Sequence, residues 1–199
     1  MFTAPTLVDR TDMVLVVVDV QDRLAAAMQR RDGVVHAIDR LARVTGLVGA
    51  PIVMTRQYPK GLGPVVGEIE QLLLHLAYEG VHVSGIDKVA FCCAVDEEFE
   101  RALKATGRSQ VVLSGMETHI CVAQTAIELV ARGYRVQVVA DACCSRQDAD
   151  HQVALERMRA AGVVITTTEA VLYEAVGAAG TDEFKQLLEI VKGSAVQSR

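Results

Sequence analysis

Short runs of consecutive apolar residues alternate along the chain with longer stretches whose apolar residues recur at helical spacing. The clearest run, residues 13–18, has no polar alternation, which is typical of a strand buried on both faces of a parallel sheet. Further strands are predicted at residues 51–55, 81–83 (a weak candidate), 111–113, 135–140 and 163–165. Because strands and helices alternate, the pattern predicts an α/β fold of three α-β-α layers with a mostly parallel sheet of about six strands.

The amphipathic stretches predict the helices that cover this sheet. Helices are expected at residues 31–48, 66–77, 96–106, 145–161, 169–176 and 181–191, and one more begins near Cys121 and stops at Gly133. In the first of these, the inner stripe consists of Val34, Val35, Ile38, Leu41, Ala42 and Thr45. The sequence at 145–148 fits a capping box. Residues 1–12, 21–28 and 56–64 are expected to be irregular.

Composition and charge narrow the classes of function. The 199 residues fit a single domain over 1–199, and the apolar content of 51% with only 4% aromatics suits a core of Val, Leu, Ile and Ala. A net charge of −5 provides no basic surface, so we expect no nucleic-acid partner. No apolar run approaches the roughly 20 residues of a membrane helix, and no secretion signal is recognised.

The five cysteines do not form a recognisable framework. Cys92, Cys93, Cys143 and Cys144 form two adjacent pairs, and no C-x-x-C motif is present. An odd number in this arrangement suits neither a set of disulfides nor a zinc site. We therefore expect reduced thiols and a cytoplasmic protein, with those four cysteines serving in packing.

Candidate chemistry lies where the strands end. Asp19, Lys88 and Cys121 each follow a predicted strand, and ligands of open parallel sheets bind at that edge. Cys121 falls in the first turn of a helix, where the helix dipole favours a thiolate. An aspartate can accept the thiol proton, and a lysine ammonium can hold the thiolate. Spacing alone leaves other roles open, because buried cysteines are often small hydrophobic core residues.

Other families with an aspartate after the first strand fit less well. A dehalogenase-like phosphatase needs a second aspartate at the position that Gln21 occupies. A nucleotide-binding fold needs a glycine-rich turn there, which is missing. A receiver-like phospho-acceptor would have to use Asp87, and its paired acids near the first strand fit poorly.

The combined motifs resemble those of the isochorismatase-like cysteine hydrolases. The resemblance rests on residues 18–21, on Lys88 with Phe91 shortly after it, and on residues 115–122, which fit the pattern G-x-x-T-x-x-C-V. Residues 57–63, 140–143 and 155–158 are most similar to the isochorismatase domain-containing branch. The similarity extends over almost the whole chain.

This resemblance implies a catalytic triad. Asp19 would be the general base, Lys88 its electrostatic partner and Cys121 the nucleophile that forms a thioester with a small amide or related metabolite. It also implies a cis peptide between Met116 and Glu117, with the amides of Glu117 and Cys121 as an oxyanion hole. The substrate-pocket candidates are Gln21, Tyr58, Phe91, Thr118 and His119.

The chain also departs from related enzymes. Nicotinamidases of this family carry a metal-binding D-x-H cluster after the second strand, where this chain has Arg56, Gln57 and Tyr58. We therefore expect no metal and no cofactor. The expected partner is a small-molecule substrate, with a homo-oligomer (a dimer or tetramer) as the assembly. A binding or scaffold protein that keeps this fold without catalysis is the competing hypothesis, although such proteins tend to lose the triad that is complete here.

Overall fold

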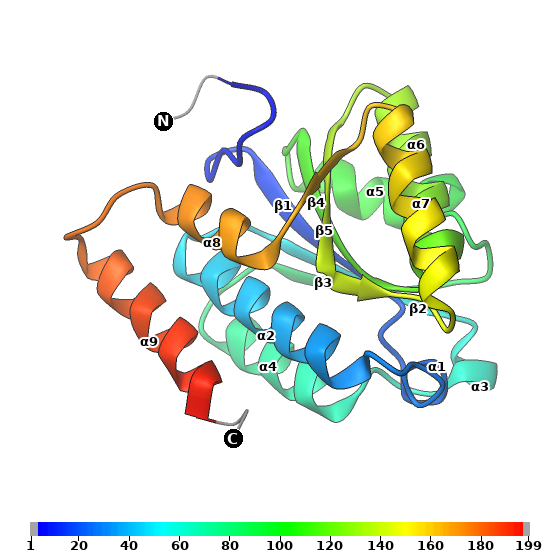
Figure 1. Cartoon of the computed structure of the whole chain (residues 1–199), viewed down its shortest axis with the longest axis horizontal. Coiled ribbons are helices and arrows are strands. Elements are labelled where there is room, and N and C mark those ends of the chain that lie inside the picture. The colour runs from blue at the N-terminus through cyan, green and yellow to red at the C-terminus, as the bar shows by residue number, and fades with distance from the viewer. Residues whose placement is uncertain (1–3, 197–199) are drawn as a thin grey trace.

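Six parallel strands form one sheet with helices on both faces in the computed structural model, which describes residues 4–196 (Figure 1). The three-layer α/β architecture predicted above is thereby confirmed. The strands are β1 (Met13–Val18), β2 (Ile52–Gln57), β3 (Val83–Lys88), β4 (Gln110–Met116), β5 (Arg135–Cys144) and β6 (Val164–Thr166). The helices are α1 (Asp22–Ala25), α2 (Arg31–Leu47), α3 (Pro59–Leu62), α4 (Gly67–Tyr78), α5 (Glu97–Ala105), α6 (Ala123–Ala131), α7 (Asp148–Ala160), α8 (Thr168–Val176) and α9 (Asp182–Val196).

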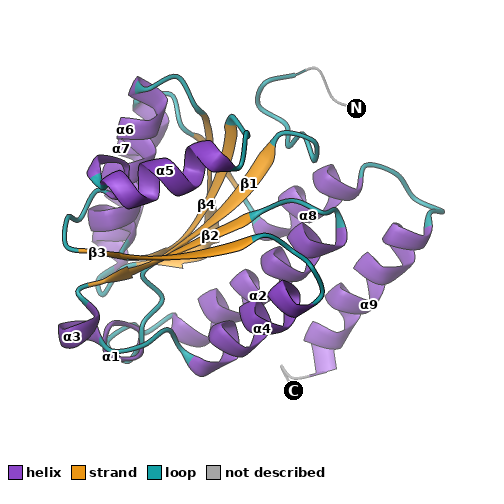
Figure 2. Ribbon diagram, turned by 180° about the vertical axis from the view of Figure 1, so that it is seen from behind, coloured by secondary structure: helices purple, strands orange, loops and turns teal. Residues whose placement is uncertain are grey.

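The two faces of the sheet are covered by different helices. Helices α2, α4, α8 and α9 lie on one face, and α5, α6 and α7 lie on the other (Figure 2). Each face has its own cluster of buried apolar side chains, because successive strand residues point to opposite sides. Leu15 and Val17 of β1 belong to the first cluster, whereas Val14 and Val16 belong to the second.

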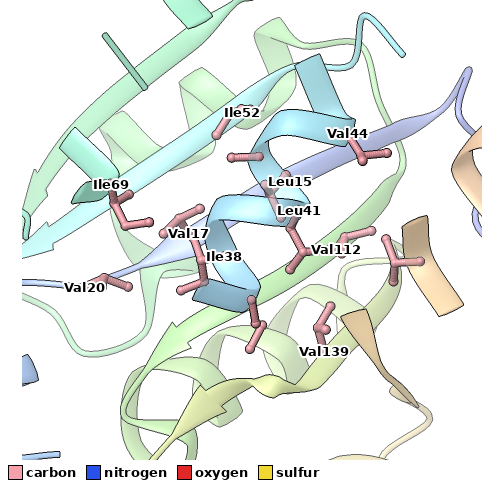
Figure 3. Packing of buried hydrophobic residues seen from close by; sticks show 14 of the residues in the cluster. Leu15, Val17, Val20, Ile38, Leu41, Val44, Ile52, Ile69, Val112 and Val139 are labelled. Carbon is pink, nitrogen blue, oxygen red and sulfur yellow. The ribbon is translucent and has the colours of Figure 1, made fainter. Parts of the chain in front are cut away.

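Helix α2 forms the centre of the first layer. Its predicted inner stripe is buried at all six positions, which confirms that prediction. Ile38 and Leu41 lie over Leu15, Val112 and Val139 of the central strands (Figure 3). The spacing of apolar residues is therefore what fixes this helix against the sheet.

The order of strands in the sheet is β3-β2-β1-β4-β5-β6. The chain starts at the centre, builds outwards to β3, and then returns to place β4 on the other side of β1. In open parallel sheets, the carboxyl ends of the strands at such a reversal form a crevice for ligands. Asp19 and Cys121 lie in the segments that follow the two strands that meet there.

Three strands are longer at their carboxyl ends than the sequence predicts. Strands β2, β4 and β5 continue past the polar residues that were expected to end them, so Gln57, Ser114 and Asp141 lie inside strands. Lys88 is the last residue of β3 and does not follow it, and Cys143 and Cys144 lie within β5. The reason is that the backbone ladder between strands continues even where the side chains turn polar.

Three loop and helix predictions also need correction. The stretch 21–28 contains the short helix α1, and 56–64 contains the end of β2 and the short helix α3. The capping box predicted at 145–148 is absent, because α7 begins after Gln147 without a side-chain cap. Cys121 lies in a π-helical turn, η2 (Thr118–Val122), ahead of α6, and not in the first turn of an α-helix.

The ends of the chain are described only in part. Residues 4–12 are irregular, as predicted, whereas residues 1–3 of that predicted stretch and residues 197–199 lie outside the described residues. No helix within residues 4–196 is long and apolar enough to cross a membrane.

Candidate active site

The reversal between β1 and β4 brings two backbones unusually close together. Val18 pairs with Gly115, which has a φ of +122°, and a Cβ at Gly115 would fall on the backbone oxygen of Val18. Only glycine fits this position, because any side chain would both clash and strain the backbone. The peptide bond from Met116 to Glu117 is cis, and the π-helical turn that carries Cys121 follows at once.

Asp19 lies at the carboxyl end of β1 in a left-handed backbone conformation, with a φ of +53°. Its carboxylate is fully buried. Asp19 Oδ1 accepts a hydrogen bond of 2.7 Å from Thr55 Oγ1, and Oδ2 accepts one of 2.7 Å from Lys88 Nζ. Buried charges are stabilised when they are paired and hydrogen-bonded, as here. The sequence analysis did not single out Thr55.

The Lys88 side chain reaches Asp19 from the end of β3 and is also fully buried. Besides Asp19, its ammonium donates to Gln57 Oε1 at 2.6 Å and to the carbonyls of Ala90 and Phe91 at 3.2 and 3.4 Å. Burial opposes its charge, but the Asp19 carboxylate at 2.7 Å favours it, and the pKa of Lys88 is raised. Lys88 is therefore a permanent cation at the site.

Gln57 is a site residue that the sequence analysis assigned only to a loop. Its Nε2 donates to the carbonyl of Val89 at 2.6 Å, which orients its oxygen toward Lys88. The buried Gln21 holds the backbone of Gln57 from both sides, since it accepts from Gln57 N at 2.7 Å and donates to Gln57 O at 3.2 Å. Gln21 also donates to the carbonyl of Gly63 at 2.8 Å, so it supports the loop after β2.

Cys121 faces this ion pair from the other side of the reversal and is 5% exposed. Burial, the charge of Asp19 and a hydrogen bond to that carboxylate raise the pKa of the Cys121 thiol, while Lys88 lowers it by less. The sequence predicts a helix dipole that favours a thiolate at Cys121, whereas burial and the charge of Asp19 act in the opposite direction and raise the pKa of the thiol. The raised pKa favours the protonated thiol in the resting protein.

A second buried cysteine lies beside these residues. Cys93 Sγ is 3.9 Å from Thr55 Oγ1, and the Cys93 amide donates to Thr125 Oγ1 at 2.9 Å. Burial raises the pKa of the Cys93 thiol to about 12, with Lys88 acting in the opposite direction. Cys93 is thus a neutral wall of the site at physiological pH, in line with the packing role expected from the sequence.

The residues between β4 and Cys121 are bonded to the segment that follows β5. The buried Glu117 carboxylate accepts from Arg146 N at 2.9 Å and from Arg146 Nε at 3.1 Å. Thr118 Oγ1 and His151 Nδ1 share a hydrogen bond of 2.9 Å. The next residue, His119, bonds through Nδ1 to Ser145 Oγ at 2.9 Å.

The pocket candidates named from the sequence occupy different environments. Tyr58 and Phe91 are 54% and 56% exposed, and each flanks Lys88: Tyr58 N donates to the Lys88 carbonyl, and the Phe91 carbonyl accepts from Lys88 Nζ. Thr118 is buried against His151, and His119 is partly exposed. Within residues 4–193, whose side chains are described, no three His, Cys, Asp or Glu residues lie together as metal ligands.

Comparisons with known proteins place this arrangement in a family. The model of the isochorismatase domain matches residues 13–170, a range that contains Asp19, Lys88 and Cys121. The chain belongs to the isochorismatase-like hydrolase family.

Relatives in this family support the assignment. Isochorismatase domain-containing protein 1 from Danio rerio is 36% identical over 180 residues, which cover 90% of this chain and 61% of the relative. The chain thus spans about three fifths of the length of that relative, and the same share of its counterpart from Salmo salar. Isochorismatase domain-containing protein 2A from Mus musculus is 34% identical over 182 residues, which cover 90% of this chain and 82% of the relative.

Solved structures of isochorismatase-like proteins share the fold. The MAR1 ribonuclease from Caenorhabditis elegans is 31% identical, with a TM-score of 0.83 over 94% of this chain and 92% of that one. YcaC from Escherichia coli, described as an octameric hydrolase of unknown specificity, is 23% identical with a TM-score of 0.84 over 96% and 94% of the two chains. At that identity the likeness to YcaC shows the fold alone.

Proposed function

We propose that this protein is a cysteine-dependent, metal-independent hydrolase of a small amide or related metabolite. The observation that supports this most strongly is the buried Asp19–Lys88 ion pair, with 2.7 Å between Oδ2 and Nζ, which lies near enough to Cys121 for both charges to act on the pKa of its thiol. A nucleophile, a proton acceptor and a fixed positive charge thus meet in one water-poor place, which is what nucleophilic catalysis by a thiol requires.

The first half of the proposed reaction acylates Cys121. As the Cys121 sulfur attacks the amide carbonyl carbon, its proton passes to Asp19. The amides of Glu117 and Cys121 hold the negative charge that develops on the carbonyl oxygen. When the intermediate collapses, the carbon–nitrogen bond breaks and the leaving amine takes the proton from Asp19. A thioester on Cys121 remains.

The second half removes the acyl group. Water attacks the thioester carbonyl and gives a proton to Asp19, which acts again as general base. Breakage of the carbon–sulfur bond then releases a carboxylic acid, and Cys121 recovers its proton. Lys88 transfers no proton in this scheme, because the three hydrogens of its ammonium already serve Asp19, Gln57 and two backbone carbonyls.

Substrate contacts are proposed for the residues around this centre. Tyr58 and Phe91, whose side chains are exposed, flank Lys88, and His119 belongs to the turn that carries Cys121, whereas the fully buried Thr118 is proposed to order that turn. We propose that Gln21 acts through the backbone of Gln57 and Gly63, whose positions it holds. No metal or cofactor takes part in this scheme.

We also propose that copies of this chain assemble into a dimer or tetramer in the cytoplasm. The octameric state described for the similarly folded YcaC supports self-association, and the five free cysteines suit a reducing compartment. Size-exclusion chromatography with light scattering tests the assembly. A monomer at micromolar concentration would contradict this part of the proposal.

The hydrolase proposal is tested with p-nitrophenyl acetate and a panel of small primary amides. We expect the wild type to release p-nitrophenolate and to carry an acetyl group on the Cys121 peptide, detected by mass spectrometry. Cys121→Ala should lose at least about 1,000-fold in rate, as nucleophile removal does in related mechanisms. Cys92→Ala, which changes a cysteine whose sulfur donates to the Gln124 carbonyl, is the control and should keep the wild-type rate.

Full activity of Cys121→Ala would contradict the proposed nucleophile. Failure of the wild type to acylate Cys121 would instead favour a binding or scaffold protein that keeps the fold.

A further inference from the structure

Three consecutive residues on the turn before Cys121 are each bonded to one short segment of the neighbouring strand and helix. Glu117 bonds to Arg146, Thr118 to His151 and His119 to Ser145. We call these three bonds the turn clamp. It joins the turn that follows β4 to the loop that follows β5 and to the first turn of α7, which come from a different part of the chain.

The extension of β5 is what makes the turn clamp possible. Between Leu113 and Gly115 the register of β4 against β5 shifts, and the ladder then continues as far as Met116 opposite Cys144. Residues after Cys144 therefore start level with Glu117. Ser145 and Arg146 come next, and α7 brings His151 over the π-helical turn one helical turn later.

Within the turn clamp, the bond between Thr118 and His151 is the one that is least accessible to solvent. Thr118 is 0% exposed and His151 is 2% exposed, so water does not readily replace either partner. By contrast, the Arg146 side chain is 58% exposed and His119 is 27% exposed. If a substitution removes the His151 side chain, water therefore cannot replace the hydrogen bond that Thr118 loses.

We propose that His151 is a positioning residue that fixes, through Thr118, the turn whose amides stabilise the developing oxyanion. This inference rests on the hydrolase function proposed above and extends it to a residue that touches neither substrate nor the reacting atoms. Thr118 lies directly between Glu117 and the residues that lead to Cys121, so a shift of Thr118 moves both proposed donor amides relative to one another.

The proposal predicts different effects on two reactions of Cys121, alkylation and acylation. A substitution that merely disordered the whole site would slow both. Alkylation by iodoacetamide is an attack on a saturated carbon, in which no oxyanion develops. Acylation by p-nitrophenyl acetate is an attack on a carbonyl, in which an oxyanion does develop. A residue that positions the donor amides should affect the second reaction and spare the first.

The experiment compares both reactions of Cys121 in His151→Leu, His151→Asn and Thr118→Val. We expect His151→Leu and Thr118→Val to slow acylation about 10- to 100-fold, below the full effect of losing one oxyanion donor. Alkylation should stay within about twofold of wild type. Asparagine can place a polar atom where His151 Nδ1 lies, so His151→Asn should recover most of the acylation rate.

Two controls make the result specific. The double variant Thr118→Val/His151→Leu should be no slower than the slower single variant, because both changes remove the same bond. His75→Leu changes an exposed histidine on α4 and should leave both reactions unchanged. Thermal melting of each variant shows that the protein compared is folded.

The outcomes distinguish the two proposals. Equal slowing of both reactions in His151→Leu, or slowing of neither, would overturn the positioning role while the hydrolase proposal stands. A wild type whose Cys121 is alkylated but never acylated would overturn the hydrolase proposal, and the positioning role with it.

Discussion

The Lys88 ammonium has three hydrogens and four nearby acceptors, from Asp19, Gln57, Ala90 and Phe91. A cation held in this way cannot turn toward a substrate, so its contribution is the positive potential it creates. That potential opposes the effect of Asp19 on Cys121, and burial together with Asp19 prevails in the resting protein. The reactivity of the thiol is therefore set by the balance between two neighbouring charges.

This balance predicts opposite effects of Asp19→Asn on two measurements. Asparagine keeps the shape of the side chain but removes the charge that raises the pKa of Cys121, so iodoacetamide alkylation at pH 7–8 should become about tenfold faster. Hydrolysis should fall by at least about 100-fold because the proposed general base is lost. Lys88→Met should slow alkylation, since Lys88 lowers that pKa. Slower alkylation in Asp19→Asn would contradict this account.

Gly115 predicts a large effect on stability from a single methyl group. In Gly115→Ala the new Cβ would fall on the backbone oxygen of Val18 at a φ of +122°. We expect the free energy of unfolding to fall by about 3 kcal/mol or more in urea denaturation. The matched control is Gly33→Ala in α2, where no atom lies within 4 Å of the new Cβ. It should gain up to about 1 kcal/mol from helix propensity, and equal effects of the two changes would refute the argument.

For most strands, the central residues could be predicted from the sequence, but the carboxyl ends that border the candidate site could not. The apolar runs located all the strands except most of β3, which includes Gly85 and Asp87 and reads poorly as a buried strand. At the carboxyl ends of β2, β4 and β5, polar residues such as Gln57 and Asp141 ended the pattern while strand pairing continued. The π-helical turn is only five residues long, too short for a periodic signal.

The residues of the candidate site were likewise predictable from the sequence only in part. Asp19, Lys88 and Cys121 were found because their residue types carry recognisable chemistry at the ends of strands. Gln57 and Thr55 were missed because an amide and a hydroxyl give no such signal, and only the fold shows that they face Lys88 and Asp19. Burial and the charge of Asp19, which raise the pKa of the Cys121 thiol, also depend on the fold and give no signal in the sequence.

The packing of α7 on the π-helical turn predicts a dependence of stability on pH. Burial and the nearby Arg30 lower the pKa of His151, while Asp148 raises it by less. The unfolded chain therefore binds a proton at His151 more readily than the folded protein does. The stability that results is present above the ordinary pKa of 6.5 and is lost as pH falls from there toward the lower folded pKa.

We expect the melting temperature to fall between pH 7 and pH 5, and His151→Asn to reduce the slope of that fall. Differential scanning fluorimetry across this range provides the measurement. His75→Asn, on an exposed surface, is the matched control and should keep the wild-type slope. An unchanged slope in His151→Asn would show that another group governs the acid response.

At the scale of the whole molecule, one sheet serves two apolar clusters. Residues of β1 contribute to both, so the helices on either face are fixed to the same strand. We propose on this basis that the chain unfolds as a single domain. Loss of packing on one face should weaken the support of the other.

Substitutions on the two faces test this expectation. Ile38→Ala in α2 and Phe99→Ala in α5 remove fully buried side chains on opposite faces. Each should lower the free energy of unfolding by about 2–5 kcal/mol. Both should shift one and the same transition in urea, followed by circular dichroism and by calorimetry. Two separate transitions, each moved by only one of the variants, would contradict a single cooperative unit.

The path of the chain through the sheet also has a bearing on biosynthesis. Asp19 directly follows β1, and Gln57 and Lys88 end β2 and β3, whereas Cys121 follows β4, which pairs with β1 only after the chain reverses. On the ribosome, the base and the ammonium are therefore made before the thiol that they govern. Of these four residues Cys121 emerges last, into a nascent protein that already contains both charges that act on its pKa, Asp19 raising it and Lys88 lowering it.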